Sequence, residues 1–148
     1  HNVCTLIDQY NAAGANIVEF MNKGIRVADR VLMIGTPEYK RRMEGAIGTG
    51  GKYEGVIITT EIYKNTDTVK FIPLLRNGDS FDDSFINIVS VLNGYDFRKD
   101  EEYEAKLQEL ADELYGRNNK IPVLGAGNAV AAMPAVRVHI SALSFEND

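Results

Sequence analysis

Residues 30–76 decide the fold of this chain, and they read RVLMIGTPEYKRRMEGAIGTGGKYEGVIITTEIYKNTDTVKFIPLLR. The apolar run over Arg30–Ile34 predicts a strand that is covered on both faces. A Gly-Thr-Pro turn and a glycine-rich loop follow, after which Tyr53–Lys64 is predicted to be a helix. Val69–Leu75 predicts a second buried strand. This order indicates two parallel strands, and open α/β sheets bind ligands where such strands end.

The flanking segments continue the alternation of strands and helices. Asn2–Ile7 predicts a short strand, and the apolar spacing from Ile17 to Ile25 predicts a helix after it. Leucines at helical spacing predict a further helix over about 100–116, with Asp100 as its N-cap. Such alternation implies a parallel sheet with helices on both faces, so we expect an α/β fold.

The C-terminal part departs from this pattern. Residues 125–135 lack periodicity and are predicted to be a tail or linker. Beyond them, apolar residues from Val136 to Ile140 alternate with polar ones, which predicts a strand that must dock into the same sheet. We therefore expect a core over residues 1–124, and a segment over 136–148 that completes the same domain.

Composition narrows the class of protein. A chain of 148 residues with 45% hydrophobic and 25% charged residues is most simply one soluble globular domain. A net charge of -5, without a long basic block, argues against a nucleic-acid partner. No apolar run approaches the length of a membrane span, and no signal peptide opens the chain. The single cysteine, Cys4, fits a reducing compartment and is expected to be buried. We therefore expect a cytoplasmic protein with no membrane partner.

Several motifs together resemble the bacterial TIR/SEFIR superfamily of flavodoxin-like signalling domains. The resemblance covers about Val3 to Leu124. Its motifs are a D-x-Y strand end at Asp8–Tyr10, ADRVLMIGTPEYKRR at 28–42, GGKYEGVIITTEIY at 50–63, KFIPLLR at 70–76, LYGR at 114–117 and IPVLG at 121–125. The resemblance implies a flavodoxin-like three-layer fold with a central parallel sheet flanked by helices.

The first-strand motif of the family stands at the C-terminal end of this chain. Such domains begin with a strand like R-V-x-I-S-x-S, and here RVHISALSFEND occupies residues 137–148. Either the domain is circularly permuted, or the printed order differs from the biological one; the alternative is an accidental extra strand. A parallel crossover needs a dozen or more residues, usually a helix. The loop between Ile140 and Val3 is too short for one, so we expect the family's first helix to be missing from this sequence.

The resemblance also implies an activity, because many bacterial TIR domains cleave NAD between nicotinamide and ribose with one helix glutamate. The matching helix here is Tyr53–Lys64, which carries Glu54 and Glu61 seven residues apart, on nearly the same face. A carboxylate beneath the ribose can stabilise the oxocarbenium-like cation that this cleavage passes through, with no nucleophilic serine and no metal. Either glutamate could be the catalytic one. The family's usual Trp-Cys-x-x-Glu form is absent, since the chain has no tryptophan.

Further contacts with the substrate follow from the resemblance. The loop after the RVHIS strand would bind the phosphates or ribose of the substrate. Its residues are Ser141, Ala142, Leu143 and Ser144. Tyr10 could stack on a nicotinamide or adenine ring, and Tyr53 lies next to Glu54 in the sequence.

Three function hypotheses result. The first is a TIR-type NAD-cleaving enzyme of bacterial defence or signalling that hydrolyses or cyclises NAD or a related nucleotide. It would be activated by homotypic self-association and would need no cofactor, since NAD is the substrate. The alternative is a non-enzymatic TIR/SEFIR adaptor that acts through protein–protein interaction. The second alternative is an enzyme like nucleoside deoxyribosyltransferase, which also uses a glutamate beneath a ribose.

Overall fold

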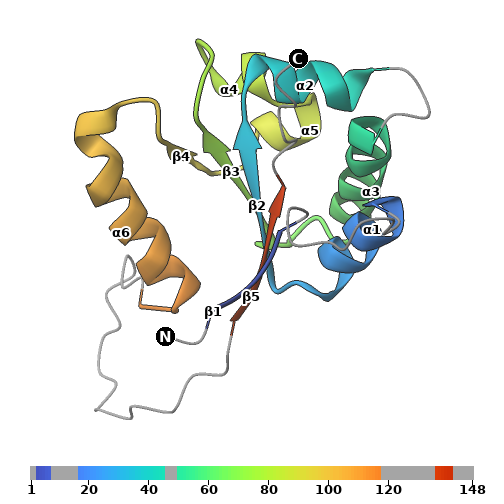
Figure 1. Ribbon diagram of the computed structural model, residues 1–148, viewed down its shortest axis with the longest axis horizontal. Helices are drawn as coiled ribbons and strands as arrows, with labels where there is room; N and C mark the ends of the chain where they lie inside the picture. Colours follow the sequence, from blue (N-terminus) through green and yellow to red (C-terminus); the bar gives the residue numbers. More distant parts are fainter. Residues whose placement is uncertain (1–2, 8–16, 46–49, 118–135, 142–148) are drawn as a thin grey trace.

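A computed structural model of the chain describes residues 3–7, 17–45, 50–117 and 136–141. Within these residues, five parallel strands form one sheet in the order β1-β5-β2-β3-β4 (Figure 1). The strands are β1 (Val3–Leu6), β2 (Arg30–Gly35), β3 (Phe71–Leu75), β4 (Tyr95–Asp96) and β5 (Val136–Ser141). The helices are α1 (Ile17–Val27), α2 (Pro37–Glu44), α3 (Gly50–Lys64), α4 (Phe81–Ser84), α5 (Asn87–Ser90), the 3₁₀ turn η2 (Asp100–Glu102) and α6 (Tyr103–Leu114).

The architecture is a flavodoxin-like three-layer α/β fold, which confirms the predicted fold class. Helix α6 covers one face of the sheet, whereas α1 and α3 lie on the other (Figure 1). When β5 is counted as the first strand, the strand order becomes 2-1-3-4-5, which is the flavodoxin-like order. Among the described residues, no helix is long and apolar enough to cross a membrane.

Two hydrophobic cores hold the layers together, one on each face of the sheet. The core beneath α1, α2 and α3 includes Met33 and Phe85, both fully buried. The core beneath α6 includes Leu32, Leu110 and Val138. Neighbouring residues of β2, Leu32 and Met33, therefore enter opposite cores, as expected for a strand with both faces covered.

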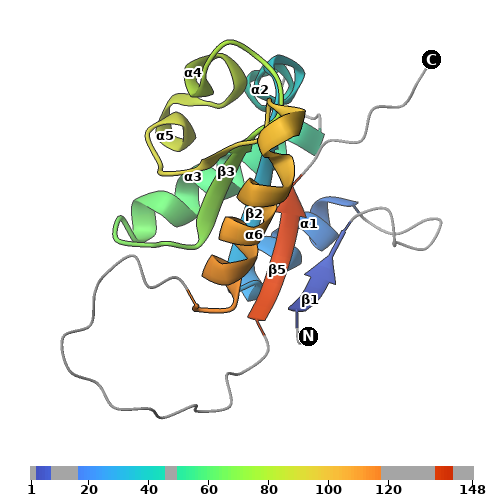
Figure 2. The same cartoon turned by 90° about the vertical axis from the view of Figure 1, so that its left-hand side faces the viewer.

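Strand β5 lies inside the sheet, between β1 and β2 (Figure 2). Hydrogen bonds between Arg137, at the start of β5, and Asp29, just before β2, align the two strands, and we call this pair of residues the clasp. The Arg137 guanidinium donates to both carboxylate oxygens of Asp29 at 3.1 and 3.2 Å, and the Arg137 backbone N–H donates to the same carboxylate at 2.7 Å. The Asp29 backbone N–H donates in turn to the Arg137 carbonyl at 2.8 Å. These bonds join residues that are 108 positions apart in the sequence.

The Asp29→Asn substitution is expected to destabilise the protein at neutral pH but not in strong acid. Hydrogen bonds from Arg137 lower the pKa of Asp29, and those from its side chain have a larger effect than the one from its backbone N–H. A carboxylate with a lowered pKa contributes stability above its unfolded-state pKa, and this contribution is lost as the pH falls through the folded-state pKa. Urea denaturation from pH 7 to pH 2 would measure the effect. The wild type should have the higher urea midpoint at pH 7, and this difference from the variant should disappear towards pH 2.

The Asp67→Asn substitution is the matched control for this experiment, because Asp67 is an exposed carboxylate in the turn after α3. It should change the denaturation midpoint little at any pH. An advantage of wild type over Asp29→Asn that persisted undiminished to pH 2 would contradict the assigned role of the clasp.

Three details of the prediction are wrong. Cys4 is exposed rather than buried, because β1 is the outermost strand of the sheet and has a neighbour on one side only. Asp100 does not cap the last helix, which begins at Tyr103 after the turn η2. Pro37 begins the eight-residue helix α2, where the sequence predicted only a turn before the glycine-rich loop.

Candidate functional site

The candidate site begins at the turn that ends β2. The Thr36 hydroxyl accepts a hydrogen bond of 3.0 Å from the Tyr39 backbone N–H and so caps α2, with Pro37 in the first turn. Thr before Pro is a typical helix start, since the hydroxyl satisfies a free N–H and proline needs none. The cap fixes the direction of the first turn. As a result, the Tyr39 side chain is only 2% exposed.

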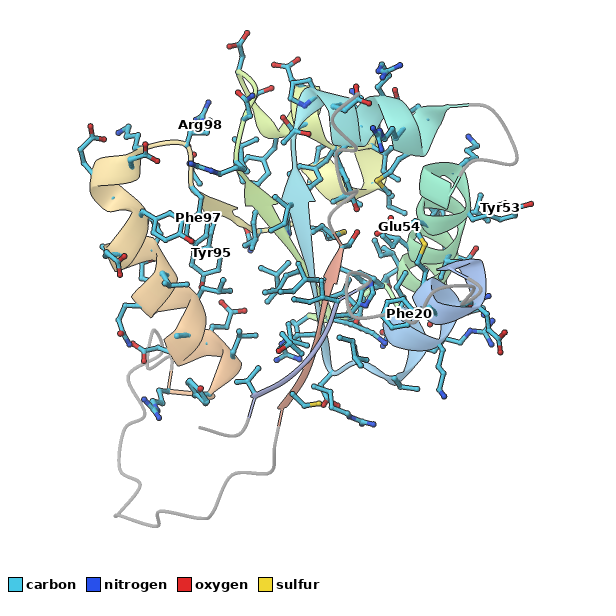
Figure 3. All side chains as sticks on the ribbon, viewed as in Figure 1. Phe20, Tyr53, Glu54, Tyr95, Phe97 and Arg98 are labelled. Atoms are coloured by element: carbon cyan, nitrogen blue, oxygen red, sulfur yellow. The ribbon has the colours of Figure 1, made fainter. Side chains whose placement is uncertain are left out.

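Three polar side chains meet there, which we call the Tyr39–Glu54–Ser141 cluster. The Tyr39 hydroxyl lies 2.7 Å from the Ser141 hydroxyl oxygen, at the carboxyl end of β5. Its other neighbour is Glu54, which points inward from the first half of α3 (Figure 3) and acts on the phenol through its charge. Glu54 and Ser141 are each only 2% exposed. The cluster thus joins α2, α3 and β5 at the edge of the sheet where parallel strands end.

Burial dominates the electrostatics of this cluster. It raises the pKa of the Tyr39 phenol well above its usual value, and the neighbouring Glu54 carboxylate raises this pKa further. The Ser141 hydrogen bond acts in the opposite direction. Tyr39 is therefore a neutral phenol at any physiological pH, and it can hydrogen bond to a carboxylate without adding a charge.

A glycine lets α3 carry Glu54 close to α2. A Cβ atom at Gly55 would lie 3.2 Å from the Met43 carbonyl oxygen, closer than side chains normally pack. The two helices therefore approach tightly at the residue next to Glu54. This contact explains how a carboxylate at the start of a surface helix becomes buried against the sheet.

Glu61 lies at the opposite end of the sheet. Its carboxylate forms an ion pair of 3.5 Å with Lys64, and its side chain is 26% exposed. It also lies close to Lys70, just before β3: burial lowers the pKa of Lys70, and the Glu61 charge opposes this effect. Two residues seven apart share a helix face but lie about 10 Å apart along the axis. Only Glu54 is at the carboxyl ends of the strands.

The other predicted contacts separate into three groups. Ser141 belongs to the cluster. Tyr53 is 43% exposed and points away from the sheet (Figure 3). Tyr10, Ala142, Leu143 and Ser144 lie outside the described residues.

Sequence reasoning did not single out Tyr39. Its position could have indicated it. Tyr39 stands three residues after the capping threonine, and it is an aromatic residue in a helix of mostly charged residues, so its ring is expected to be buried. The sequence could not show that Tyr39 is buried next to Ser141, because the two residues are 102 positions apart.

Two cavities lie away from the cluster. One of about 740 Å³ runs between β3, β4 and α6, and residues such as Tyr95, Glu109 and Glu113 line it. A smaller one of about 230 Å³ lies outside α2 and α3 next to Gly55. Neither is lined by a cluster residue. We place the candidate site at the cluster because its carboxyl group, that of Glu54, is buried at the carboxyl ends of the parallel strands.

Within the described ranges, no three His, Cys, Asp or Glu side chains are grouped so that they could hold a metal ion. No protein-family model matches this chain, and neither a curated protein nor a solved structure matches it.

Proposed function

We propose that this chain is a TIR-type domain that cleaves the N-glycosidic bond between nicotinamide and ribose in NAD, with Glu54 as the catalytic carboxylate. The observation that carries the proposal is the burial of Glu54 beside Tyr39 and Ser141 at the carboxyl edge of the parallel sheet. Open α/β sheets bind their ligands at this edge. The resemblance of residues 28–42 and 50–63 to TIR domains supplies the substrate class.

The reaction needs little beyond a well-placed negative charge. Nicotinamide in NAD is a cationic pyridinium, so it departs as a neutral base with the bonding electron pair and needs no acid. The ribose is left as an oxocarbenium ion, and the Glu54 carboxylate beneath it stabilises the positive charge. Water then adds to the same carbon and releases a proton, which gives ADP-ribose; attack by an adenine nitrogen gives a cyclic product instead.

Burial makes Glu54 the better suited of the two glutamates for this role. The interaction between a carboxylate and a cation is several times stronger in a protein interior than in water. Glu54 is 2% exposed, whereas the Glu61 charge is already paired with Lys64 and partly hydrated. We therefore assign the catalytic role to Glu54 alone.

Nicotinamide release from NAD tests the proposal. The purified chain is incubated with NAD at rising protein concentration, with and without a crowding agent, and the products are separated by chromatography. We expect nicotinamide together with equimolar ADP-ribose or its cyclic form, and a specific activity that rises with concentration if self-association activates the enzyme.

Two other outcomes would each overturn the proposal. Formation of oligomers without nicotinamide release would identify an adaptor that works by self-association. Exchange of the base in deoxynucleosides, with NAD left intact, would identify a deoxyribosyltransferase-like enzyme. The same samples serve for sedimentation and for both assays, so the three functions are compared under one set of conditions.

A further inference from the structure

We infer that the cavity between β3, β4 and α6 binds a small ligand that carries an ammonium or guanidinium group on an apolar body, with Glu113 as the carboxylate that receives the cation. The inference is independent of the proposed function, because no residue of the Tyr39–Glu54–Ser141 cluster lines this cavity. The cavity volume of about 740 Å³ is within the range of small-molecule sites.

The shortness of β4 explains why the cavity exists. Strand β3 has five residues, but β4 has two and pairs only with the last two of β3. The Leu75 carbonyl accepts from the Phe97 backbone N–H at 2.8 Å, so the backbone of Pro73, two residues earlier, faces the same side. Proline has no N–H to offer a strand there. Within the described residues, the first part of β3 thus has no strand on this side, and Phe71 and Ile72 line the cavity instead.

Part of the cavity lining is apolar. Phe71 and Ile72 are each 4% exposed, and Leu92 and Val69 lie on the same cavity. Val69 is 66% exposed, so a ligand that covers it would remove an apolar side chain from water. This lining favours a ligand with an aromatic or aliphatic body.

The rest of the lining includes three carboxylates, and two of them have a cationic partner. The Arg98 Nε atom donates to both carboxylate oxygens of Asp96, at 2.9 and 3.1 Å. The Lys106 ammonium lies 3.2 Å from the Glu109 carboxylate. In the part of the chain that the structure describes, no cation forms an ion pair with the third carboxylate, Glu113. The cavity therefore keeps one uncompensated negative charge, and the ligand complementary to it is a cation.

Tyr95 holds the Glu113 carboxylate without neutralising it. The Tyr95 hydroxyl donates to one Glu113 oxygen at 2.6 Å, and the ring lies between β4 and α6 (Figure 3). Burial, and then the hydrogen bond to Glu113, raise the pKa of the Tyr95 phenol, so it stays a neutral donor. A carboxylate accepts hydrogen bonds at both oxygens, so the second oxygen can accept from the N–H groups of a cation.

Titration with 2-phenylethylamine tests the inference, because this probe joins an ammonium group to an aromatic ring. The full chain is labelled with ¹⁵N, and its backbone amide shifts are followed by NMR at pH 7. We expect saturable shifts at residues of the cavity such as Asn93, Gly94 and Glu113. The neutral analogue 2-phenylethanol has nearly the same shape and should bind about 10- to 100-fold more weakly, the effect of losing a hydrogen bond between charged groups.

Glu113→Gln assigns the carboxylate. It should weaken the binding of 2-phenylethylamine by about 10- to 100-fold and leave the binding of 2-phenylethanol unchanged. The amide oxygen can still accept from Tyr95, so the spectrum without ligand should remain that of a folded protein. Glu104→Gln is the matched control, because it removes the same charge from an exposed residue of α6 that does not line the cavity. Its effect on the affinity should be within about twofold.

Four results would each overturn the inference. They are the absence of saturable shifts at the cavity with 2-phenylethylamine, an equal affinity for the amine and the alcohol, an unchanged affinity in Glu113→Gln, and an equal loss in Glu104→Gln. The last result would mean that the acidic surface of α6 attracts cations without a defined site. The first two results need only the wild type, so they decide the matter even if Glu113→Gln does not fold.

Discussion

Glu54→Gln is expected to lower kcat for nicotinamide release from NAD by about 10²- to 10³-fold, the scale seen when one preorganised electrostatic group is removed from an active site. The amide has nearly the shape of the carboxylate and fits the same space. It lacks the negative charge that the ribosyl cation requires. The loss should therefore fall on kcat, while KM changes little.

Glu61→Gln is the matched control, because the substitution is the same and lies on the same helix. Its effect on kcat should be within about twofold, since Glu61 is partly exposed and paired with Lys64 at the other end of α3. An effect of Glu61→Gln as large as that of Glu54→Gln would contradict our assignment. Unchanged turnover in both variants would reject a carboxylate mechanism on α3.

Stability measurements keep the loss of activity distinct from a loss of folding. Glu54→Gln replaces a carboxyl group that is 2% exposed with an amide of similar size, so its denaturation midpoint should be equal to or above that of wild type. Glu54→Ala should lower the midpoint, because it removes a side chain that is 2% exposed and leaves a cavity beside Tyr39. A Glu54→Gln variant that unfolds as readily as Glu54→Ala would indicate a structural role for the charge.

Phe85→Ala is expected to cost about 3–5 kcal/mol of unfolding free energy, a large part of the roughly 5–15 kcal/mol of a typical domain. Phe85 is fully buried between β2 and the helices above it. Its ring stacks on Phe81 with centroids 5.8 Å apart and meets Tyr39 edge to face. Removing it leaves a cavity directly behind the candidate site. The urea midpoint and the slope of the transition would measure the loss.

Val91→Ala is the control for this variant, since Val91 is 79% exposed in the same region of the chain. Its effect should stay within about 0.5 kcal/mol. A comparable loss in both variants would mean that Phe85 is not packed as described.

A double substitution tests the contact between Phe85 and Gly35. A Cβ atom at Gly35 would lie 2.1 Å from the Phe85 Cζ atom, so Gly35→Ala alone should overpack the core and cost about 1–3 kcal/mol. In the Phe85→Ala background the added methyl group enters the space that the ring has left. The combined loss should therefore be smaller than the sum of the two single losses, and strict additivity would contradict the contact.

The prediction from sequence succeeded for elements whose pattern of apolar residues is continuous in the chain and long enough to be recognised. The apolar runs of β2 and β3 and the periodic apolar positions of α6 were found. Strand β4 has two residues and α4 has four, so each spans only about one period of its pattern, and the pattern does not repeat. Their position depends on packing against the rest of the domain.

The candidate site was predicted only in part, for a different physical reason. Helical periodicity reports which face of α3 a residue occupies, but not how far along the axis its partners lie. Glu54 and Glu61 were therefore equivalent in the sequence, although one is buried beside Tyr39 and the other pairs with Lys64 at the surface. Tyr39 was missed because its partner Ser141 lies on a strand that is distant in the sequence.

By itself, the sequence determined the α/β class and the order of the major strands and helices, because these depend on residues close together in the chain. The tertiary structure alone decided that β5 lies between β1 and β2, and that Glu54, not Glu61, is the neighbour of Tyr39. Both results depend on contacts between segments that are remote in sequence. Such contacts form only when the sheet and its helices are assembled.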